Sequence, residues 1–184
     1  MTSIIKVDNI QHSSGTNALT TDSDGVVSRS LVPAFFLTLG TSADTRTATT
    51  EAAIPFAVQS DSGSNSTYIQ GSMTVSNGVV TVPKTGLYYF NTVARFDTVV
   101  QGNWARLGLS TDGETLFNSA NTYQTLRLNP SVLGVTYGAY EPLCVSAVLK
   151  LNANQTIESR ASVYTDTTWS ISAYDSHFTG YFIG

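Results

Sequence analysis

The last nine residues of this chain, Ser176–Gly184, constrain its fold more than any other segment. Successive side chains of a β-strand point to opposite faces. One face of this segment carries Phe178, Gly180 and Phe182, and the other carries Thr179, Tyr181 and Ile183. A strand of a solitary sandwich should be apolar toward the core and polar toward water. The second apolar face therefore predicts a covering subunit, and we expect a β-domain that forms an oligomer.

The segment Leu87–Phe96 shows the same two-sided pattern and is the strongest predicted strand. One of its faces carries Tyr88, Phe90, Ala94 and Phe96, and the other carries Leu87, Tyr89 and Val93. We predict that this segment and the C-terminal segment lie side by side in one inner sheet, between the core and the oligomer axis. The residues expected at the subunit interface are Leu87, Tyr89, Val93, Tyr181 and Ile183.

A chain of this length makes one substantial domain with an N-terminal extension, or two small units. Of the 184 residues, 41% are hydrophobic but only 12% are charged, which is about half the usual charged share. No window repeats apolar residues at helical spacing for three turns, so we predict almost no helix. A net charge of −4 without a Lys/Arg cluster argues against nucleic-acid binding. No apolar run approaches the roughly 20 residues that span a bilayer, so we expect no membrane insertion.

Cysteine usage and the N-terminus bear on the cellular setting. Cys144 is the only cysteine, so an intrachain disulfide is excluded. Its neighbours Val145, Ser146 and Ala147 suggest that it is a small buried side chain. The first residues lack a basic segment followed by an apolar run, so we expect no secretory signal and synthesis in a cytoplasm.

The chain divides into residues 1–32 and residues 33–184. The first region holds the aliphatic segment Ile4–Ile10 and an Asp24-Gly25 hairpin signal, with too few large apolar residues for a core of its own. From Pro33 onward the pattern is β throughout, apart from a Thr/Ala/Ser-rich loop to about Glu51. Eight or more short strands separated by turns predict a sandwich, jelly roll or barrel. The expected strands are Ala34–Leu39, Ser72–Val75, Val79–Val82, Leu87–Phe96, Arg106–Leu109, Glu114–Phe117, Leu143–Leu151, Gln155–Tyr164, Trp169–Ala173 and Phe178–Ile183.

Four segments resemble the C1q/TNF-like jelly roll and occur in that family's order: Pro33–Phe36, Val82–Phe90, Leu107–Glu114 and His177–Phe182. The second contains Pro-x-x-Gly-x-Tyr-x-Phe, and the last contains Phe-x-Gly-x-Phe. The resemblance covers residues 33–184 and implies a ten-strand, two-sheet jelly roll that assembles as a homotrimer. The turn Asn152–Gln155 departs from the family's frequent Gly-Asp turn, which leaves a metal site there without support.

The N-terminal region resembles the opening of many tailed-bacteriophage fibre and virion-appendage proteins. The resemblance lies in Ile4–Gln11, Ser13–Thr16 and Ala18–Thr20. In those proteins such a segment docks the fibre onto the particle. The resemblance implies docking to other virion proteins, of the capsid or tail, and a location on the virion surface after assembly in the host cytoplasm. The docking residues it implies are Ile4, Ile5, Val7 and Ile10.

The sequence contains no motif for catalysis, metal binding or a cofactor. His12 and His177 lack partners at metal-ligand spacing. Asp22-x-Asp24-Gly25 lacks the third acidic position and the distal Glu of a calcium loop, and a hairpin turn explains the same residues. No carboxylate pair, phosphate loop or nucleophile elbow stands out. We therefore predict a protein that is not an enzyme and uses no cofactor.

Three loops are explained least by folding and are the candidate contacts with a host glycan or protein. They span residues 99–104, 118–133 and 164–169, and the last mixes Tyr, Asp and Trp in a way that suits stacking on sugar rings. Alternatively, the two tryptophans fill the core, because tryptophan is highly buried on average. The candidate contact residues are Trp104, Tyr123, Arg127, Tyr164, Asp166 and Trp169.

These observations favour a phage surface protein, the trimeric knob of a tail fibre or head fibre that docks by its N-terminus and binds the host surface. One alternative is a purely structural capsid decoration or cement protein on a symmetry axis. A second is a cellular C1q-like recognition module, which the missing secretory signal and collagen-like stalk disfavour. The short N-terminal extension favours a stubby projection over a long fibre.

Overall fold

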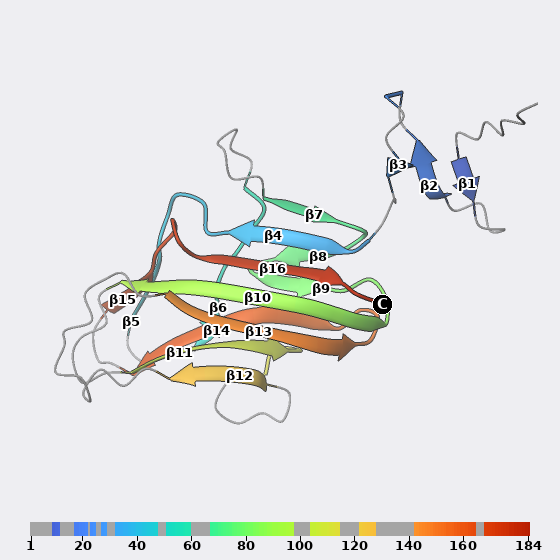
Figure 1. Ribbon diagram of the computed structural model, residues 1–184. Coiled ribbons are helices and arrows are strands. Elements are labelled where there is room, and N and C mark those ends of the chain that lie inside the picture. The colour runs from blue at the N-terminus through green and yellow to red at the C-terminus, as the bar shows by residue number, and fades with distance from the viewer. Residues whose placement is uncertain are drawn as a thin grey trace, which may run out of the picture. The chain divides into compact units, whose positions relative to one another are not determined.

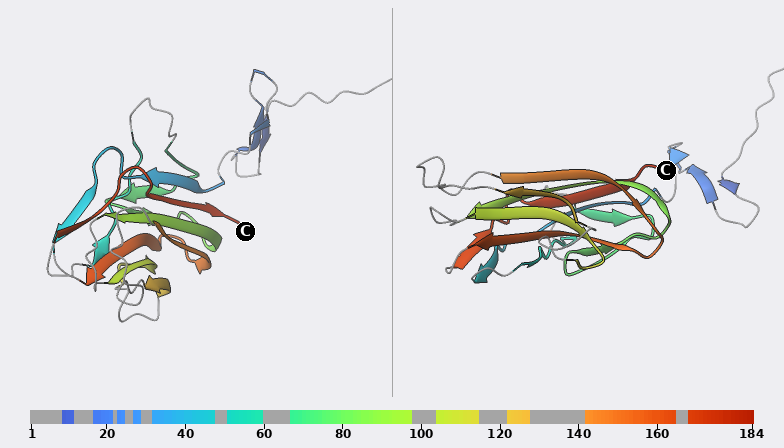
Figure 2. Two further views of the ribbon diagram at one scale, coloured as in Figure 1. Left: turned by 60° about the vertical axis from the view of Figure 1, so that its left-hand side comes forward. Right: turned by 90° about the horizontal axis from the view of Figure 1, so that it is seen from below.

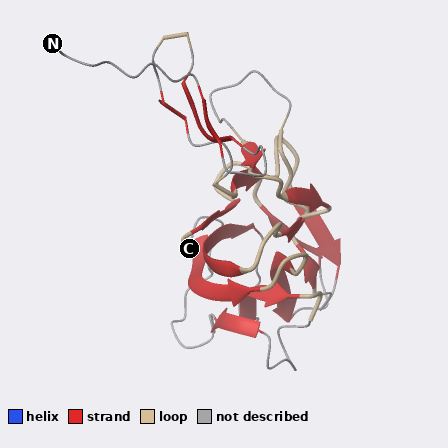
Figure 3. Ribbon diagram, turned by 90° about the vertical axis from the view of Figure 1, so that its right-hand side faces the viewer, coloured by secondary structure: helices blue, strands red, loops and turns tan. Residues whose placement is uncertain are grey.

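The computed structural model describes residues 9–11, 17–21, 23–24, 27–28, 32–47, 51–59, 67–97, 104–114, 122–127, 142–164 and 168–184. The chain forms two compact units, Met1–Val32 and Pro33–Gly184. All regular elements in these ranges are β-strands, as Figure 3 shows, which confirms the all-β prediction. Among the described residues no helix is long and apolar enough to cross a membrane.

The first unit contains a three-stranded antiparallel sheet in the order β1-β2-β3. Its strands are β1 (Asn9–Gln11), β2 (Asn17–Thr21) and β3 (Val27–Ser28). Thr21 pairs with Val27 across the Asp24 turn, which confirms the predicted hairpin. Ile10 lies in β1 opposite Leu19. The other proposed docking residues, Ile4, Ile5 and Val7, lie outside the described residues.

The second unit contains two antiparallel sheets packed face to face (Figures 1 and 2). The first has the order β5-β15-β10-β16-β4-β7, and β13 also pairs with β10. Its strands are β4 (Ala34–Thr38), β5 (Asp44–Thr47), β7 (Tyr68–Gln70), β10 (Gly86–Asp97), β13 (Pro142–Leu151), β15 (Thr168–Ile171) and β16 (His177–Phe182). The second has the order β12-β11-β14-β9-β8, with β6 also paired to β14. Its strands are β6 (Ala52–Ala53), β8 (Thr74–Ser76), β9 (Val79–Thr81), β11 (Trp104–Thr111), β12 (Thr122–Arg127) and β14 (Thr156–Tyr164).

The long strand β10 organises the first sheet. Over residues 88–93 it pairs with β13 on one edge and with β16 on the other, and its last two residues pair with β15. We predicted that the two segments with apolar residues on both faces lie side by side in one sheet, and this pairing confirms it. The predicted inward face of β10 is buried in the core: Tyr88, Phe90, Ala94 and Phe96.

Aromatic rings meet beneath the centre of this sheet, around Gly180. The Phe35 and Phe178 rings pack edge to face at 4.8 Å, and the Phe90 ring lies 6.2 Å from that of Phe178. Gly180 is opposite Phe35 on β4 and Phe90 on β10. A Cβ atom at Gly180 would lie 2.5 Å from Phe90 and 2.8 Å from Phe35. Glycine is required here because the flanking rings occupy the space of a side chain.

Polar contacts also join the two sheets. The hydroxyls of Thr92 on β10 and Ser159 on β14 are 2.7 Å apart, and both residues are fully buried. Thr92 also donates a hydrogen bond to the His177 carbonyl at 3.3 Å. A buried hydroxyl without a partner is costly, so this pair favours one alignment of the sheets.

The buried Arg46 side chain connects several strands. The Arg46 guanidinium on β5 donates to the Asp44 carboxylate and to the carbonyls of Ala52, Ala53 and Ala161. It also lies over the Trp169 ring, 5.3 Å from the centroid. Hydrogen bonds and an opposite charge are what make a buried arginine tolerable. Arg46 therefore connects β5, β6, β14 and β15.

Most turn predictions hold, but two predicted loops contain strands. Asn77 and Gly78 have φ values of 48° and 79° and join β8 to β9, as their sequence predicts. The loop prediction for residues 40–51 is wrong, because Asp44–Thr47 forms β5. The loop prediction for 118–133 is also wrong, because Thr122–Arg127 forms β12. Neither strand has a regular apolar alternation. β5 pairs with β15, which is distant in sequence, and β12 pairs with the preceding strand, β11.

The Asp112-Gly113 turn is present, with φ values of 55° and 77°. The strand predicted to follow it, at Glu114–Phe117, lies outside the described residues except for Glu114, which is not in a strand.

We predict that Gly180→Ala lowers the free energy of unfolding by about 1–3 kcal/mol, because the new methyl group overlaps the Phe35 and Phe90 rings. Gly184→Ala is the matched control, since a Cβ atom there meets nothing within 4 Å. Urea unfolding followed by tryptophan fluorescence measures both. Equal stability of the two variants would contradict the packing around Gly180.

For the polar pair, we predict that Thr92→Val costs about 1–3 kcal/mol, because it leaves the buried Ser159 hydroxyl without this partner. Ser159→Ala should cost less, because Thr92 keeps its bond to the His177 carbonyl. The double variant Thr92→Val/Ser159→Ala should be more stable than Thr92→Val alone. A double-mutant cycle of urea unfolding checks this order, and strict additivity would refute it.

Candidate functional site

The candidate site is the surface of the first sheet that points away from the core. We name it the outer face. It is formed by alternate residues of β4, β7, β10, β13 and β16 and by the residue after β16. Its members are Ala34, Phe36, Thr38, Tyr68, Gln70, Leu87, Tyr89, Asn91, Val93, Arg95, Asp97, Pro142, Cys144, Ser146, Val148, Lys150, His177, Thr179, Tyr181 and Ile183.

Apolar side chains dominate one half of the outer face. Tyr89 and Tyr181 are directly opposite each other, with ring centroids 5.3 Å apart. Around them Leu87, Val148 and Ile183 are 44%, 57% and 52% exposed, and Tyr181 is 47% exposed. Large exposed apolar groups gathered on one sheet face are typical of a contact surface. All five residues predicted at the subunit interface lie on the outer face, with Tyr89 and Val93 partly buried.

A polar row crosses the middle of this surface. It consists of Thr179 on β16, Asn91 on β10 and Ser146 on β13, which are in register. The Thr179 hydroxyl donates to the Phe35 carbonyl at 2.9 Å, and the Asn91 amide donates to the Cys144 sulfur at 3.2 Å. The expectation that Cys144 is buried is therefore wrong for the protomer, where Cys144 is exposed. The alternation of β13 points Leu143 and Val145 inward and Cys144 outward.

A third row contains Thr38, His177, Val93 and Cys144. The His177 ring stacks on Phe36, with centroids 5.5 Å apart and planes at 28°. Burial lowers the pKa of His177 below its usual 6.5, because a charged imidazolium loses hydration there.

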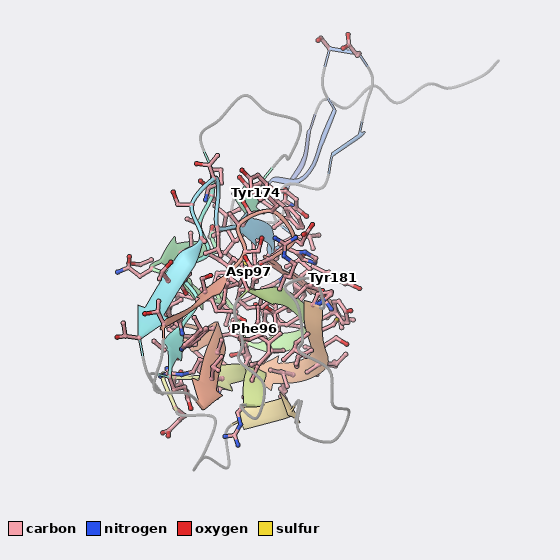
Figure 4. The ribbon with its side chains drawn as sticks, turned by 90° about the vertical axis from the view of Figure 1, so that its left-hand side faces the viewer. Phe96, Asp97, Tyr174 and Tyr181 are labelled. Atoms are coloured by element: carbon pink, nitrogen blue, oxygen red, sulfur yellow. The ribbon has the colours of Figure 1, made fainter. Side chains whose placement is uncertain are left out.

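A charged cluster lies at one end of the outer face, where β10 ends. The Arg95 guanidinium pairs with the Asp175 carboxylate and, at 3.3 Å, with that of Asp97. Nearby in sequence, Tyr174 in the turn between β15 and β16 is 79% exposed. Figure 4 shows Tyr174 and Tyr181 well apart, with Phe96 among the interior side chains. Neither Tyr174 nor Val148 was identified from the sequence as a surface residue of interest. The period of two along β13 could have identified Val148, because it places Val148 on the same face as Cys144.

The structure separates the residues predicted to contact a receptor. Trp104 and Tyr164 are register partners at the ends of β11 and β14, although they were predicted in different loops. Tyr123 and Arg127 belong to β12, where Arg127 is opposite Arg106. Asp166 lies outside the described residues.

The surface role predicted for Trp169 is wrong. Trp169 is only 1% exposed and stacks on Phe96, with ring centroids 5.8 Å apart. The alternative reading, a tryptophan that fills the core, is confirmed for this residue.

The described residues contain no group of three or more His, Cys, Asp or Glu side chains that could hold a metal ion. The outer face offers shape and apolar area, and its charged residues lie at its two ends, Lys150 at one and Arg95 and Asp97 at the other. This arrangement can bind a complementary apolar surface.

Comparison with known proteins supports the fold. No protein-family model matches the sequence, and no curated protein is significantly similar to it. The structure of murine APRIL at pH 5.0 is similar, with a TM-score of 0.54 and 13% identity over 83% of this chain and 99% of that one. Murine APRIL at pH 8.0 gives 0.55 and 11% identity over 82% and 98%. The fold is therefore a jelly roll of the TNF-like kind, as the sequence resemblance implied.

Proposed function

We propose that this protein is the trimeric knob of a bacteriophage surface appendage, a tail fibre or head fibre. In this proposal residues 1–32 dock to other virion proteins, and residues 33–184 form the trimer and bind a glycan or protein of the host surface. The role is binding rather than catalysis.

The observation that carries the trimer is the outer face. Leu87, Val148, Tyr181 and Ile183 are each more than two-fifths exposed on a sheet whose other side already packs on the core. Removing such apolar area from water stabilises a complex by about 25 cal/mol per Å². A closed ring of copies is a common way to cover a surface of this kind, because most oligomers of one chain have closed symmetry.

The proposed virion location is supported by the N-terminal sequence. Residues 4–20 resemble the docking segments of phage appendages, and the chain divides at Val32 into two compact units. Antibody labelling of purified particles, viewed by electron microscopy, tests this location and separates a tail position from a head position. Absence of label from every particle would refute the virion role.

We predict that the wild-type protein has three times its chain mass of 19.6 kDa in solution. Tyr181→Glu should reduce the mass to that of one chain, because the new carboxylate would be desolvated at the interface. Tyr174→Glu is the matched control: it changes the same residue type at a more exposed site outside the outer face. Light scattering measures the mass, and circular dichroism checks folding.

A trimeric Tyr181→Glu protein, or a wild-type protein that is one chain at micromolar concentration, would contradict the proposed interface. Cys144 supplies a second readout, because its exposed thiol lies on the outer face. A maleimide should label it slowly in the wild-type trimer and rapidly in folded Tyr181→Glu.

For host recognition, we predict that Tyr164→Ala or Asp166→Ala lowers adsorption of the purified trimer to host cells by about tenfold or more, as for central contact residues. The trimer mass should not change. Asp24→Ala, at an exposed position of the first unit, is the control and should adsorb normally. Normal adsorption of both knob variants would remove residues 164–166 as the receptor contact.

A further inference from the structure

His177 occupies an inner position of the outer face. It lies between Thr38 on β4 and Val93 on β10, in a row that ends at Cys144 on the next strand. Its ring is stacked on Phe36, and the residue is already half-buried in the protomer. Any copy that covers the outer face must therefore approach this imidazole.

The surroundings of His177 offer little to balance a positive charge. The neighbouring side chains from β4, β7, β10 and β13 include Phe36, Thr38, Tyr68, Val93 and Cys144, none of which is an acidic residue. The charged members of the outer face lie at its two ends: Lys150 is opposite Leu87 at the far end of β10, and Arg95 and Asp97 follow Val93 at the near end.

The charged groups nearest to His177 are at the near end of β10 and in the turn before β16. Arg95, two residues after Val93 on β10, adds another cation, and the carboxylates of Asp97 and Asp175 are already paired with it. The Phe36 ring attracts a stacked cation only weakly. This attraction is smaller than the cost of the hydration that the cation loses on burial.

We propose that His177 makes assembly of this protein sensitive to acid: the subunits associate while the imidazole is neutral and separate when it takes up a proton. The inference rests on the proposed trimer and adds its regulation. Each trimer contains three copies of His177, so the effect of protonation on the association constant is greater than that of a single histidine.

The sign follows from proton linkage. Burial lowers the pKa of His177 in the protomer, and the loss of further water on assembly would lower it more. The free protomer then binds the proton more readily than the trimer does. The association constant is at its full value near neutral pH and falls as the pH drops through the pKa of His177 in the free protomer, which lies below 6.5. The association constant then falls by up to about tenfold per pH unit for each histidine.

The chain has only two histidines, and His12 lies in the other unit, so it is a natural control. Sedimentation velocity of dilution series at pH 7.5 and pH 5.0, at constant ionic strength, gives the concentration at which half the protein is dissociated. For the wild type and for His12→Gln we expect this concentration to rise at least tenfold at pH 5.0. For His177→Gln it should change less than threefold.

His177→Phe is the second variant, because it keeps an aromatic ring against Phe36 but cannot take up a proton. It should also remain trimeric at pH 5.0. If either variant is too stable to dilute apart, subunit exchange between N-terminally labelled populations replaces the dilution series, with the same expected pH dependence.

The outcomes separate the two proposals. A wild-type protein that is one chain at both pH values refutes the trimer and, with it, this inference. A trimer of equal strength at both pH values refutes the inference and leaves the trimer standing. A pH dependence that persists in both His177 variants also refutes it, because another group must then take up the proton.

Discussion

The pairing of β10 with β16 is the contact on which the remaining structure depends. Both strands are apolar on both faces, so hydrophobic alternation alone does not choose between this register and one shifted by a residue. Gly180 selects the observed register. Its place opposite Phe35 and Phe90 leaves room for their rings, and a side chain at this position would overlap them. The same register brings Tyr89 opposite Tyr181 on the other side of the sheet.

Once this register is set, the two sides of the sheet take different roles. The inner side joins the second sheet through aromatic packing and through the Thr92–Ser159 pair. The outer face keeps large apolar side chains in water, and its charged residues, Lys150, Arg95 and Asp97, lie only at its two ends. A surface so poor in charge resembles the buried centre of an interface more than an ordinary solvent-facing sheet. The proposed trimer and its sensitivity to acid both follow from what this surface contains and lacks.

The part of the candidate site that alternation governs was predictable. Tyr181, Ile183, Leu87, Tyr89 and Val93 were placed on one face from the sequence alone, and the structure puts them there. Cys144 was wrongly predicted to be buried, because the prediction relied on the general preference of cysteine for burial. The alternation of side chains along β13 decides its face instead. Trp169 was predicted as the start of a strand and also as a candidate receptor contact at the end of a loop, with core filling as the alternative. Arg46 and Phe96 enclose it from strands about 70 or more residues away in sequence.

The sequence by itself determined that the chain is β-rich, where most turns fall, and which residues of each long strand share a face. These properties depend on side-chain period and on turn residues, both of which are local. Only the tertiary structure decided that Asp44–Thr47 and Thr122–Arg127 form strands, and that β13 and β14 belong to different sheets. It also decided that Trp104 pairs with Tyr164. These arrangements arise from hydrogen bonding and packing between segments far apart in the chain, which no local pattern records.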